Sequence, residues 1–204
     1  MLMYNLNEKE IQAAKKIITA GVVKAAESLS FFMNETVTLK ETNDSGSDFP
    51  LSLSKKADQN IHLLVTKVIG EIKGVCWLIF SEEEADHLRS AALPAEILNS
   101  PEMMAEMSDG IMLEVDNIIS ASVITQFSNL LKIKIHGGVP NLEKVSYPEM
   151  ENLVQEQMDK ERFLINFSAS FESSKANFNP EFVWLFDNDF IECIKKVALL
   201  EENN

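Results

Sequence analysis

Residues 74–80 read Gly-Val-Cys-Trp-Leu-Ile-Phe, and residues 182–186 read Phe-Val-Trp-Leu-Phe. Such short apolar runs, rich in β-branched and aromatic side chains, are typical of buried strands. Each run leads directly into an expected helix, over 82–93 and 187–200, with acidic residues in its first turn, where negative charge favours the helix dipole. The passage from buried strand to helix thus occurs twice, which predicts an α/β protein.

The elements before these strands also recur in the same order. The first half is expected to contain a helix, a strand, a loop and a strand, over 7–33, 36–39, 43–60 and 61–69. The second half is expected to contain a helix, a strand, a polar segment that is irregular or partly helical, and a strand, over 108–131, 132–135, 137–160 and 163–171. A shift of 98 residues also aligns apolar positions of the two long helices, such as Ala25 with Val123. We therefore predict an internal repeat, with copies over about 7–93 and 101–200.

Each copy alone could form a three-stranded sheet with one exposed apolar face, whereas the pair could bury that face in one larger sheet. We predict a single α/β domain over 1–204 that consists of two similar halves related by pseudo-two-fold symmetry. Its central sheet is expected to be mainly antiparallel or mixed, with about six strands, because the sequence between 36 and 80 is poor in helix signals. The two long helices, over 7–33 and 108–131, are expected to cover this sheet.

The chain is strongly acidic: 32 Asp and Glu against 18 Lys and Arg give a formal net charge of −14. Such a surface repels phosphate backbones and anionic lipid, so we expect neither nucleic acid nor membrane insertion, and a basic surface on a protein partner fits better. No apolar run approaches the roughly 20 residues of a membrane span, and the N-terminal residues lack the pattern of a signal peptide. Together with two cysteines outside any paired motif, these features predict a cytoplasmic protein.

The sequence lacks the motifs that are characteristic of several kinds of catalytic or binding site. The sequence has no glycine-rich phosphate loop after a strand and no nucleophile elbow. None of its three histidines has a second ligand at metal-binding spacing: His62, His87 and His136. We therefore expect no metal site and no cofactor in this chain.

The long helix over 108–131 carries the most distinctive polar pattern. At about 100° per residue, one stripe of this helix contains Gly110, Glu114, Asn117, Ala121 and Ser128. The opposite, apolar face is expected to be buried through Met112, Ile119, Val123, Phe127 and Leu130. The polar stripe places a carboxylate and a carboxamide one turn apart between small residues. It could therefore let the surface of another protein approach closely while presenting both groups.

Glu114-x-x-Asn117 on a helix, followed by Pro140 after 22 intervening residues, resembles the phosphatase signature of the CheC, CheX and FliY family of chemotaxis proteins. The two strand-to-helix passages are similar to that family as well, so the resemblance covers nearly the whole chain. The duplicated layout is most like CheC. The resemblance implies a CheC-like fold and a protein phosphatase that removes the aspartyl phosphate from a phosphorylated CheY-like receiver domain.

The resemblance also implies a role for each motif residue. Asn117 would enter the receiver's active site and orient a water in line with the phosphate, while Glu114 would pair with the receiver's active-site lysine. Pro140 completes the signature, and Gly110 and Ala121 would form the surface of close approach beside it. A neutral amide can donate to and accept from a water without repelling phosphoryl oxygens, and positioning is most of what phosphoryl transfer requires. The Mg²⁺ of the reaction is expected in the receiver, not in this chain.

Two departures leave alternatives open. Gly110 stands where the family prefers Ser or Asp, and because Gly disfavours helix interiors we expect it near the entrance of its helix. The first helix has Lys16 and Thr19 where the Glu and Asn would be repeated, and Lys16 would repel the receiver's lysine, so we expect at most one active face. A non-catalytic receiver-binding module of the same fold is the alternative to a phosphatase. A third reading is an acidic adaptor that binds a CheD-type deamidase.

Overall fold

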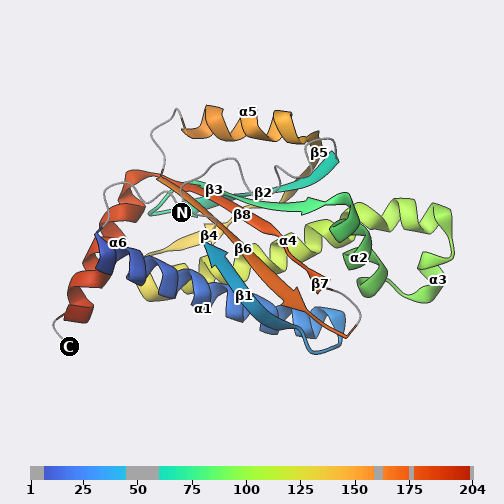
Figure 1. Ribbon diagram of the computed structural model, residues 1–204, viewed down its shortest axis with the longest axis horizontal. Helices are drawn as coiled ribbons and strands as arrows, with labels where there is room; N and C mark the ends of the chain where they lie inside the picture. The colour runs from blue at the N-terminus through green and yellow to red at the C-terminus, as the bar shows by residue number, and fades with distance from the viewer. Residues whose placement is uncertain (1–6, 45–59, 159–162, 175–176, 203–204) are drawn as a thin grey trace.

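The computed structural model describes residues 7–44, 60–158, 163–174 and 177–202. In these residues one sheet lies between helices on both of its faces (Figure 1). The helices are α1 Glu8–Met33, α2 Glu82–Ala92, α3 Ala95–Leu98, α4 Pro101–Leu131, α5 Tyr147–Met158 and α6 Asn188–Glu202. The strands are β1 Thr38–Asp44, β2 Asn60–Gly70, β3 Gly74–Ser81, β4 Ile135–Gly137, β5 Asn141–Ser146, β6 Phe163–Glu172, β7 Asn177–Phe178 and β8 Glu181–Phe186.

The strands of this sheet pair antiparallel throughout the described residues, which confirms the antiparallel prediction. The strand order is β1-β6-β8-β3-β2-β4, with β5 also on β2 and β7 on β6. The described residues thus form eight strands rather than about six, because neither β5 nor β7 was expected. Strand β1 of the first half lies beside β6 of the second half. The two halves therefore interleave instead of each forming a separate three-stranded sheet.

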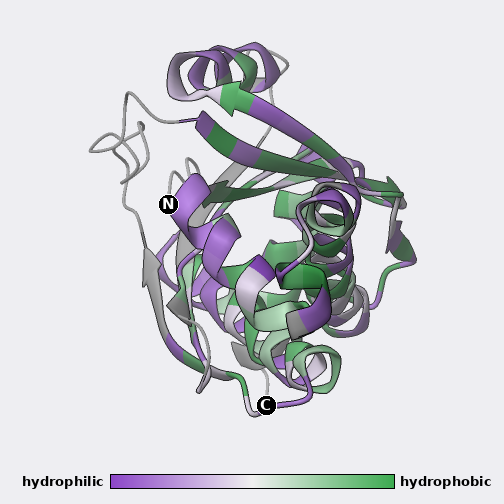
Figure 2. Cartoon of the chain, turned by 90° about the vertical axis from the view of Figure 1, so that its right-hand side faces the viewer, coloured by the Kyte–Doolittle hydropathy of each residue, from purple (hydrophilic) through white to green (hydrophobic). Residues whose placement is uncertain are grey.

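Alternate residues of the central strands point to opposite faces of the sheet. Even-numbered residues of β3 and β8, such as Leu78 and Trp184, pack in the larger core with α1, α2, α4 and α6. Odd-numbered residues, such as Trp77 and Val183, pack in a smaller core with α5. Figures 1 and 2 show α5 on one side of the sheet and the long helices α1 and α4 on the other. The expected cover by two long helices is therefore confirmed for one face, while the second face has a helix that was not expected to reach it.

The turn between β2 and β3 requires glycine. Gly70 has a φ of +135°, and a Cβ at this position would lie 2.1 Å from the backbone oxygen of Lys134. Val68 then lies opposite Gly74 in the hairpin. The close approach at Gly70 brings the end of β2 against the segment that follows α4, next to β4.

Helix α4 is longer than predicted. It begins at Pro101 rather than near residue 108, and Pro is favoured in the first turn because the backbone N–H it lacks would have no helical partner there. Gly110 therefore lies in the interior of the helix and not at its entrance. The N-terminus was missed because the polar and methionine-rich residues after Pro101 do not continue the apolar face of the later turns.

The chain after α4 also differs from the prediction. Lys132 ends the helix in a left-handed conformation with a φ of 55°, so the strand expected over 132–135 begins only at Ile135. The segment over 137–160, expected to be irregular or partly helical, contains both β5 and α5. Strand β5 is an edge strand with mostly exposed or half-buried residues, so its polar sequence has no alternating apolar pattern that would identify it.

At the other edge of the sheet, β1 is longer than the strand expected over 36–39. It extends to Asp44 because it pairs with β6 through polar residues, which a search for apolar alternation does not detect. Residues 45–59 of the loop expected over 43–60 lie outside the described residues.

Candidate functional site

The polar stripe of α4 faces outward. Glu114 and Asn117 are exposed, and Ala121 lies on the same exposed side. The opposite side of α4 packs in the larger core through fully buried residues: Met112, Ile119, Val123 and Phe127. Leu130, expected on that buried face, is instead 42% exposed, because its neighbour Leu131 occupies the core position at the end of the helix.

A surface hollow of about 640 Å³ brings the predicted motif together. Gly110, Glu114 and Asn117 line it from α4, and Pro140 lines it from the segment between β4 and β5. The other lining residues are Ile69, Leu113, His136, Gly137, Gly138 and Val139. Ala121, which was predicted at the site, does not line the hollow and lies one turn farther along α4.

Pro140 lies near α4 because β4, which precedes it, pairs with the end of β2. Ile69 lies opposite His136 in this strand pair, and the backbone N–H of Gly138 donates to the carbonyl oxygen of Lys67 at 2.8 Å. The chain then continues into β5, which pairs with the earlier part of β2. Pro140 is therefore held between two strand pairs, which fixes its position relative to the helix.

The two polar side chains at the centre of the hollow are available to a partner. Neither Glu114 nor Asn117 makes a side-chain hydrogen bond or ion pair within the described part of the chain. A Cβ added at Gly110, one turn before Glu114, would meet no atom within 4 Å. The site is thus an open carboxylate and an open carboxamide on a helix whose other face is fixed in the core.

Six lining residues were not predicted from the sequence: Ile69, Leu113, His136, Gly137, Gly138 and Val139. Val139 is 91% exposed and Ile69 is 45% exposed, so two apolar side chains border the polar pair. Exposed apolar groups around polar ones are a feature of protein-contact surfaces. An apolar residue directly before Pro140 could have drawn attention to Val139, whereas Ile69 and His136 reach the hollow only through the pairing of β2 with β4.

A buried carboxylate lies next to the polar pair on α4. Asp116 is fully buried, its Oδ2 accepts from Thr66 Oγ1 at 2.6 Å, and its Oδ1 accepts from Ser120 Oγ at 3.0 Å. Burial raises the pKa of Asp116 to about 6, against the opposing effect of these two hydrogen bonds. The sequence contains a signal for this buried group, because Asp116 falls one turn from Met112 and Ile119 on the apolar face.

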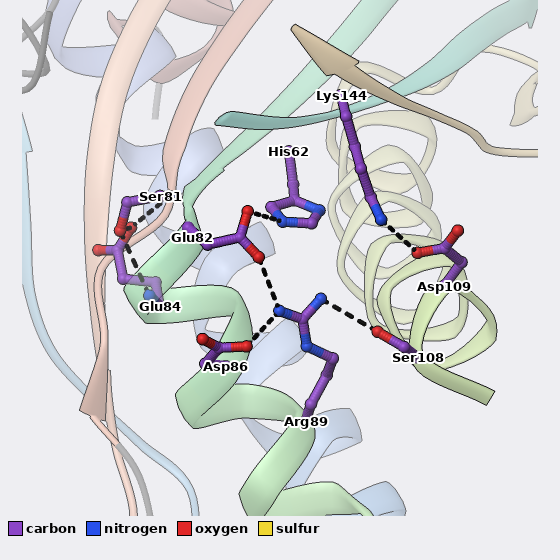
Figure 3. Close-up of polar contacts among 9 residues, drawn as sticks. All are labelled: His62, Ser81, Glu82, Glu84, Asp86, Arg89, Ser108, Asp109 and Lys144. Atoms are coloured by element: carbon purple, nitrogen blue, oxygen red, sulfur yellow. Dashed lines mark hydrogen bonds and ion pairs between the residues drawn. The ribbon is translucent and has the colours of Figure 1, made fainter. Parts of the chain in front are cut away.

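A polar network holds the first half of α4 against α2 and β5 (Figure 3). The buried guanidinium of Arg89, on α2, donates to Ser108 Oγ at 3.0 Å and to Glu82 Oε1 at 3.1 Å. From β5, Lys144 forms an ion pair with Asp109 at 3.2 Å. These contacts lie directly before Gly110, so they fix the part of α4 that leads into the candidate site.

His62 belongs to the same network and reaches it from β2 (Figure 3). Its Nε2 lies 3.0 Å from Glu82 Oε2, and its side chain is fully buried. Burial lowers the pKa of His62, and this effect exceeds the opposing influence of the Glu82 carboxylate. His62 is therefore a buried residue of β2 that takes part in a structural network.

Two kinds of feature are absent from the described ranges. No helix there is both long enough and apolar enough to cross a bilayer. No three His, Cys, Asp or Glu side chains gather there in an arrangement that could hold a metal ion.

On α1, Lys16 and Thr19 are exposed in the same way as Glu114 and Asn117 on α4.

Comparison with solved structures shows what the fold is similar to. FliY of Thermotoga maritima superposes with a TM-score of 0.62 at 13% identity, covering 96% of this chain and 98% of that chain. A chain of the CheX–CheY–BeF₃–Mg²⁺ complex from Borrelia burgdorferi gives 0.55 at 12% identity, covering 84% and 98%. The middle domain of FliM from Vibrio alginolyticus gives 0.55 at 12% identity, covering 91% and 99%. No protein-family model and no curated protein matches the sequence.

The fold is therefore similar to the one that CheX, FliY and the FliM middle domain share. This agrees with the class of protein that the Glu114, Asn117 and Pro140 motif resembles. At such low identity the likeness concerns the fold, and the function must be argued from the residues of the hollow on α4.

Proposed function

We propose that this protein docks on a phosphorylated CheY-like receiver domain in chemotaxis signalling and hydrolyses its aspartyl phosphate. The observation that carries the proposal is the hollow on α4, where Gly110, Glu114, Asn117 and Pro140 meet at the surface. These residues come from two separate parts of the sequence, and the β2–β4 pairing unites them. The fold adds support, because it is shared with a chain of a complex that contains CheX, CheY, BeF₃ and Mg²⁺.

Asn117 supplies the group that would act on the attacking water. Its amide can accept a hydrogen bond from the water and donate another without bringing a negative charge near the phosphoryl oxygens. In the reaction the water oxygen bonds to phosphorus, the bond from phosphorus to the aspartyl oxygen breaks, and inorganic phosphate and the free carboxylate result. Asn117 contributes orientation, which is the main requirement of phosphoryl transfer. The Mg²⁺ belongs to the receiver in this proposal.

Glu114 would fix the docked orientation by pairing with a lysine of the receiver. Its carboxylate is exposed and has no partner in the described part of the chain, so docking breaks no internal ion pair. The apolar side chains of Val139 and Ile69 would add contact area around the polar pair. On the equivalent helix α1, the positive charge of Lys16 would oppose the same contact, so one face is proposed to act.

The test is the loss of phosphate from a purified receiver that has been phosphorylated with a small phosphodonor. A substoichiometric amount of this protein is expected to shorten the lifetime of the phosphate, and the receiver should leave the complex dephosphorylated. A receiver that binds but loses its phosphate at the unassisted rate would reject catalysis and retain docking. A receiver that does not bind at all would reject both.

A non-catalytic receiver-binding module is the second candidate. It is favoured by Gly110, which stands where the phosphatase family prefers Ser or Asp, and by the similarity of the fold to the FliM middle domain. A CheD-type deamidase as partner stays a prediction that rests on the acidic charge of the chain. Recovery of such a deamidase, but of no receiver, in a pull-down would favour that adaptor role.

We also infer that the chain is one duplicated domain with pseudo-two-fold symmetry. The strand order supports this, because exchanging β1, β2 and β3 with β4, β6 and β8 turns the order of the sheet into its own reverse. A cytoplasmic location follows from the proposed receiver partner and is part of the same proposal.

A further inference from the structure

We propose that this protein has a second binding site, for an amphiphilic anion such as a medium-chain fatty carboxylate, on the face of the sheet that carries α5. A cavity of about 670 Å³ lies there, between the ends of β2 and β3 and the helix. Its apolar lining side chains include Leu63, Val65, Val75, Trp77 and Leu153. Small-molecule sites typically have volumes of about 300–1,000 Å³ and mostly apolar walls with a few polar groups, so this cavity has a suitable size and lining.

The floor of the cavity is part of the smaller core. Leu63, Val75 and Trp77 belong to that core and are buried, while Val65 and Leu153 pack at its border and are half-buried. Helix α5 contributes Leu153 to the cavity, and its earlier residues pack on the core beside it. The cavity therefore begins where the packing of α5 against the sheet ends, and an apolar chain placed there would extend the existing core.

Trp77 provides a polar group that has no protein partner. Its side chain is 4% exposed, and its Nε1 is buried without a hydrogen-bond acceptor among the described residues. A buried indole N–H normally has an acceptor, and leaving it unpaired costs free energy. Trp77 lines the cavity, but its Nε1 is shielded from solvent, so a bound molecule would accept from this N–H only after a shift of the indole or of the side chains that cover it.

The charges around the cavity favour an anion. Lys67 and Lys73 line it and are exposed, and neither ammonium group has an ion pair in the described part of the chain. The only carboxylate among the lining residues that the structure describes is Glu143, and its Oε1 already accepts from Asn141 Nδ2 at 3.0 Å. Two unpaired cations beside an apolar cavity contrast with the net charge of −14. A carboxylate head near the lysines with an alkyl tail on the apolar floor would satisfy both features.

This site is separate from the hollow of the proposed phosphatase. Trp77 and Val75 lie on the α5 face of the sheet, whereas Glu114 and Asn117 lie on a helix of the opposite face. Ile69, at the end of β2, is a lining residue of both. Binding of the anion does not depend on a receiver, so this inference can fail or hold independently of the proposed function.

The test is a titration of the ¹⁵N-labelled protein with sodium dodecanoate, in which NMR monitors the indole N–H signals. The protein has two tryptophans, and a Trp77→Phe variant assigns its signal by loss. The Trp77 signal is expected to shift in a saturable manner, with a Kd below about 1 mM, while the Trp184 signal on the opposite face moves little. Dodecyltrimethylammonium, which has the same chain and a positive head, is expected to bind at least about tenfold more weakly because it meets two lysines.

Charge-reversal variants separate this site from general adsorption. Lys67→Glu combined with Lys73→Glu is expected to weaken dodecanoate at least about tenfold and to favour the cationic amphiphile instead. The control, Lys24→Glu combined with Lys196→Glu, makes the same change of net charge on exposed parts of α1 and α6 and should leave binding unchanged. Equal weakening in both variants, or no saturable shift of the Trp77 signal, would overturn the proposal. Self-association through this face without dodecanoate binding would overturn it as well.

Discussion

Thr66 Oγ1 donates a 2.6 Å hydrogen bond to Asp116 Oδ2 inside the core, and so joins β2 to α4 one residue before Asn117. Ser120 supplies a second donor, to Oδ1. Both donors are neutral hydroxyls, so an ionised Asp116 is a buried charge without a countercharge among these contacts. Such a group is costly, and it makes the packing of α4 sensitive to pH.

The first prediction concerns Asp116 and stability. Its pKa in the folded protein is about 6, against an ordinary value of 3.8, so between these values the folded chain binds more protons than the unfolded chain. The contribution of Asp116 to stability is therefore most favourable near pH 4, decreases as the pH rises through 6 and is constant above that. The full change is on the order of 3 kcal/mol.

Asp116→Asn should remove this pH dependence. Urea unfolding at several pH values between 4 and 8 would measure the free energy of unfolding of wild type and variant. Taking the difference between the two proteins cancels the effects of other titrating groups. The variant should become more stable relative to wild type as the pH rises. A difference that stays constant across this range would show that Asp116 does not titrate as described.

The second prediction uses Gly21, which lies where α1 crosses α4. A Cβ at this position would be 2.7 Å from Cγ1 and 3.0 Å from Cα of Val123. Gly21→Ala should destabilise the protein by about 1–3 kcal/mol, because overpacking exceeds the gain in helix propensity. Chemical unfolding measures this change, and an unfolding free energy equal to or above that of wild type would contradict the close crossing of the two helices.

The third prediction applies the same substitution to Gly110. This residue is inside α4, and an added Cβ would meet no atom within 4 Å. Gly110→Ala should therefore stabilise the protein by about 0.5–1 kcal/mol through helix propensity alone. Opposite signs for the two glycines are the expected pattern in parallel urea titrations, and destabilisation by Gly110→Ala would argue against an open surface beside Glu114.

The fourth prediction separates docking from hydrolysis. Glu114→Gln keeps the shape of the side chain but removes the charge proposed to pair with the receiver's lysine. Binding of a receiver activated with BeF₃ and Mg²⁺ should weaken at least about tenfold, with a smaller salt dependence than wild type. Glu102→Gln, at another exposed position of α4, is the control and should bind as wild type does. Equal affinities for wild type and Glu114→Gln would place the docking contact elsewhere.

The parts of the fold that the sequence predicts are those with regular apolar patterns. The buried runs at 74–80 and 182–186 are strands β3 and β8, and the periodic helices α1 and α4 cover one face of the sheet. Strand β5 and the outer part of β1 were not predicted, because edge strands with polar side chains are held by backbone pairing rather than by apolar alternation. The interleaved strand order depends on pairing between distant segments, which local sequence does not encode.

Some residues of the candidate site could likewise be predicted from the sequence and others could not. Glu114 and Asn117 follow from helical spacing, whereas Pro140 is predicted only by the resemblance to the CheC, CheX and FliY signature. Ile69 and His136 could not be predicted, since both reach the hollow through the pairing of β2 with β4. Asp116 differs from these two residues, because a charged residue on the apolar face of a helix is visible in the sequence and indicates a buried polar group.

The role proposed for Asn117 has a direct test. The rate of phosphate loss from a phosphorylated receiver would be measured with wild type, Asn117→Ala and Asn129→Ala, the last being the same change at another exposed position of α4. Asn117→Ala should lose about 100-fold or more of the acceleration, the size of effect seen when a single positioned polar group is removed, while still binding the receiver. Asn129→Ala should retain full activity. Acceleration by Asn117→Ala equal to that of wild type would contradict the proposed mechanism.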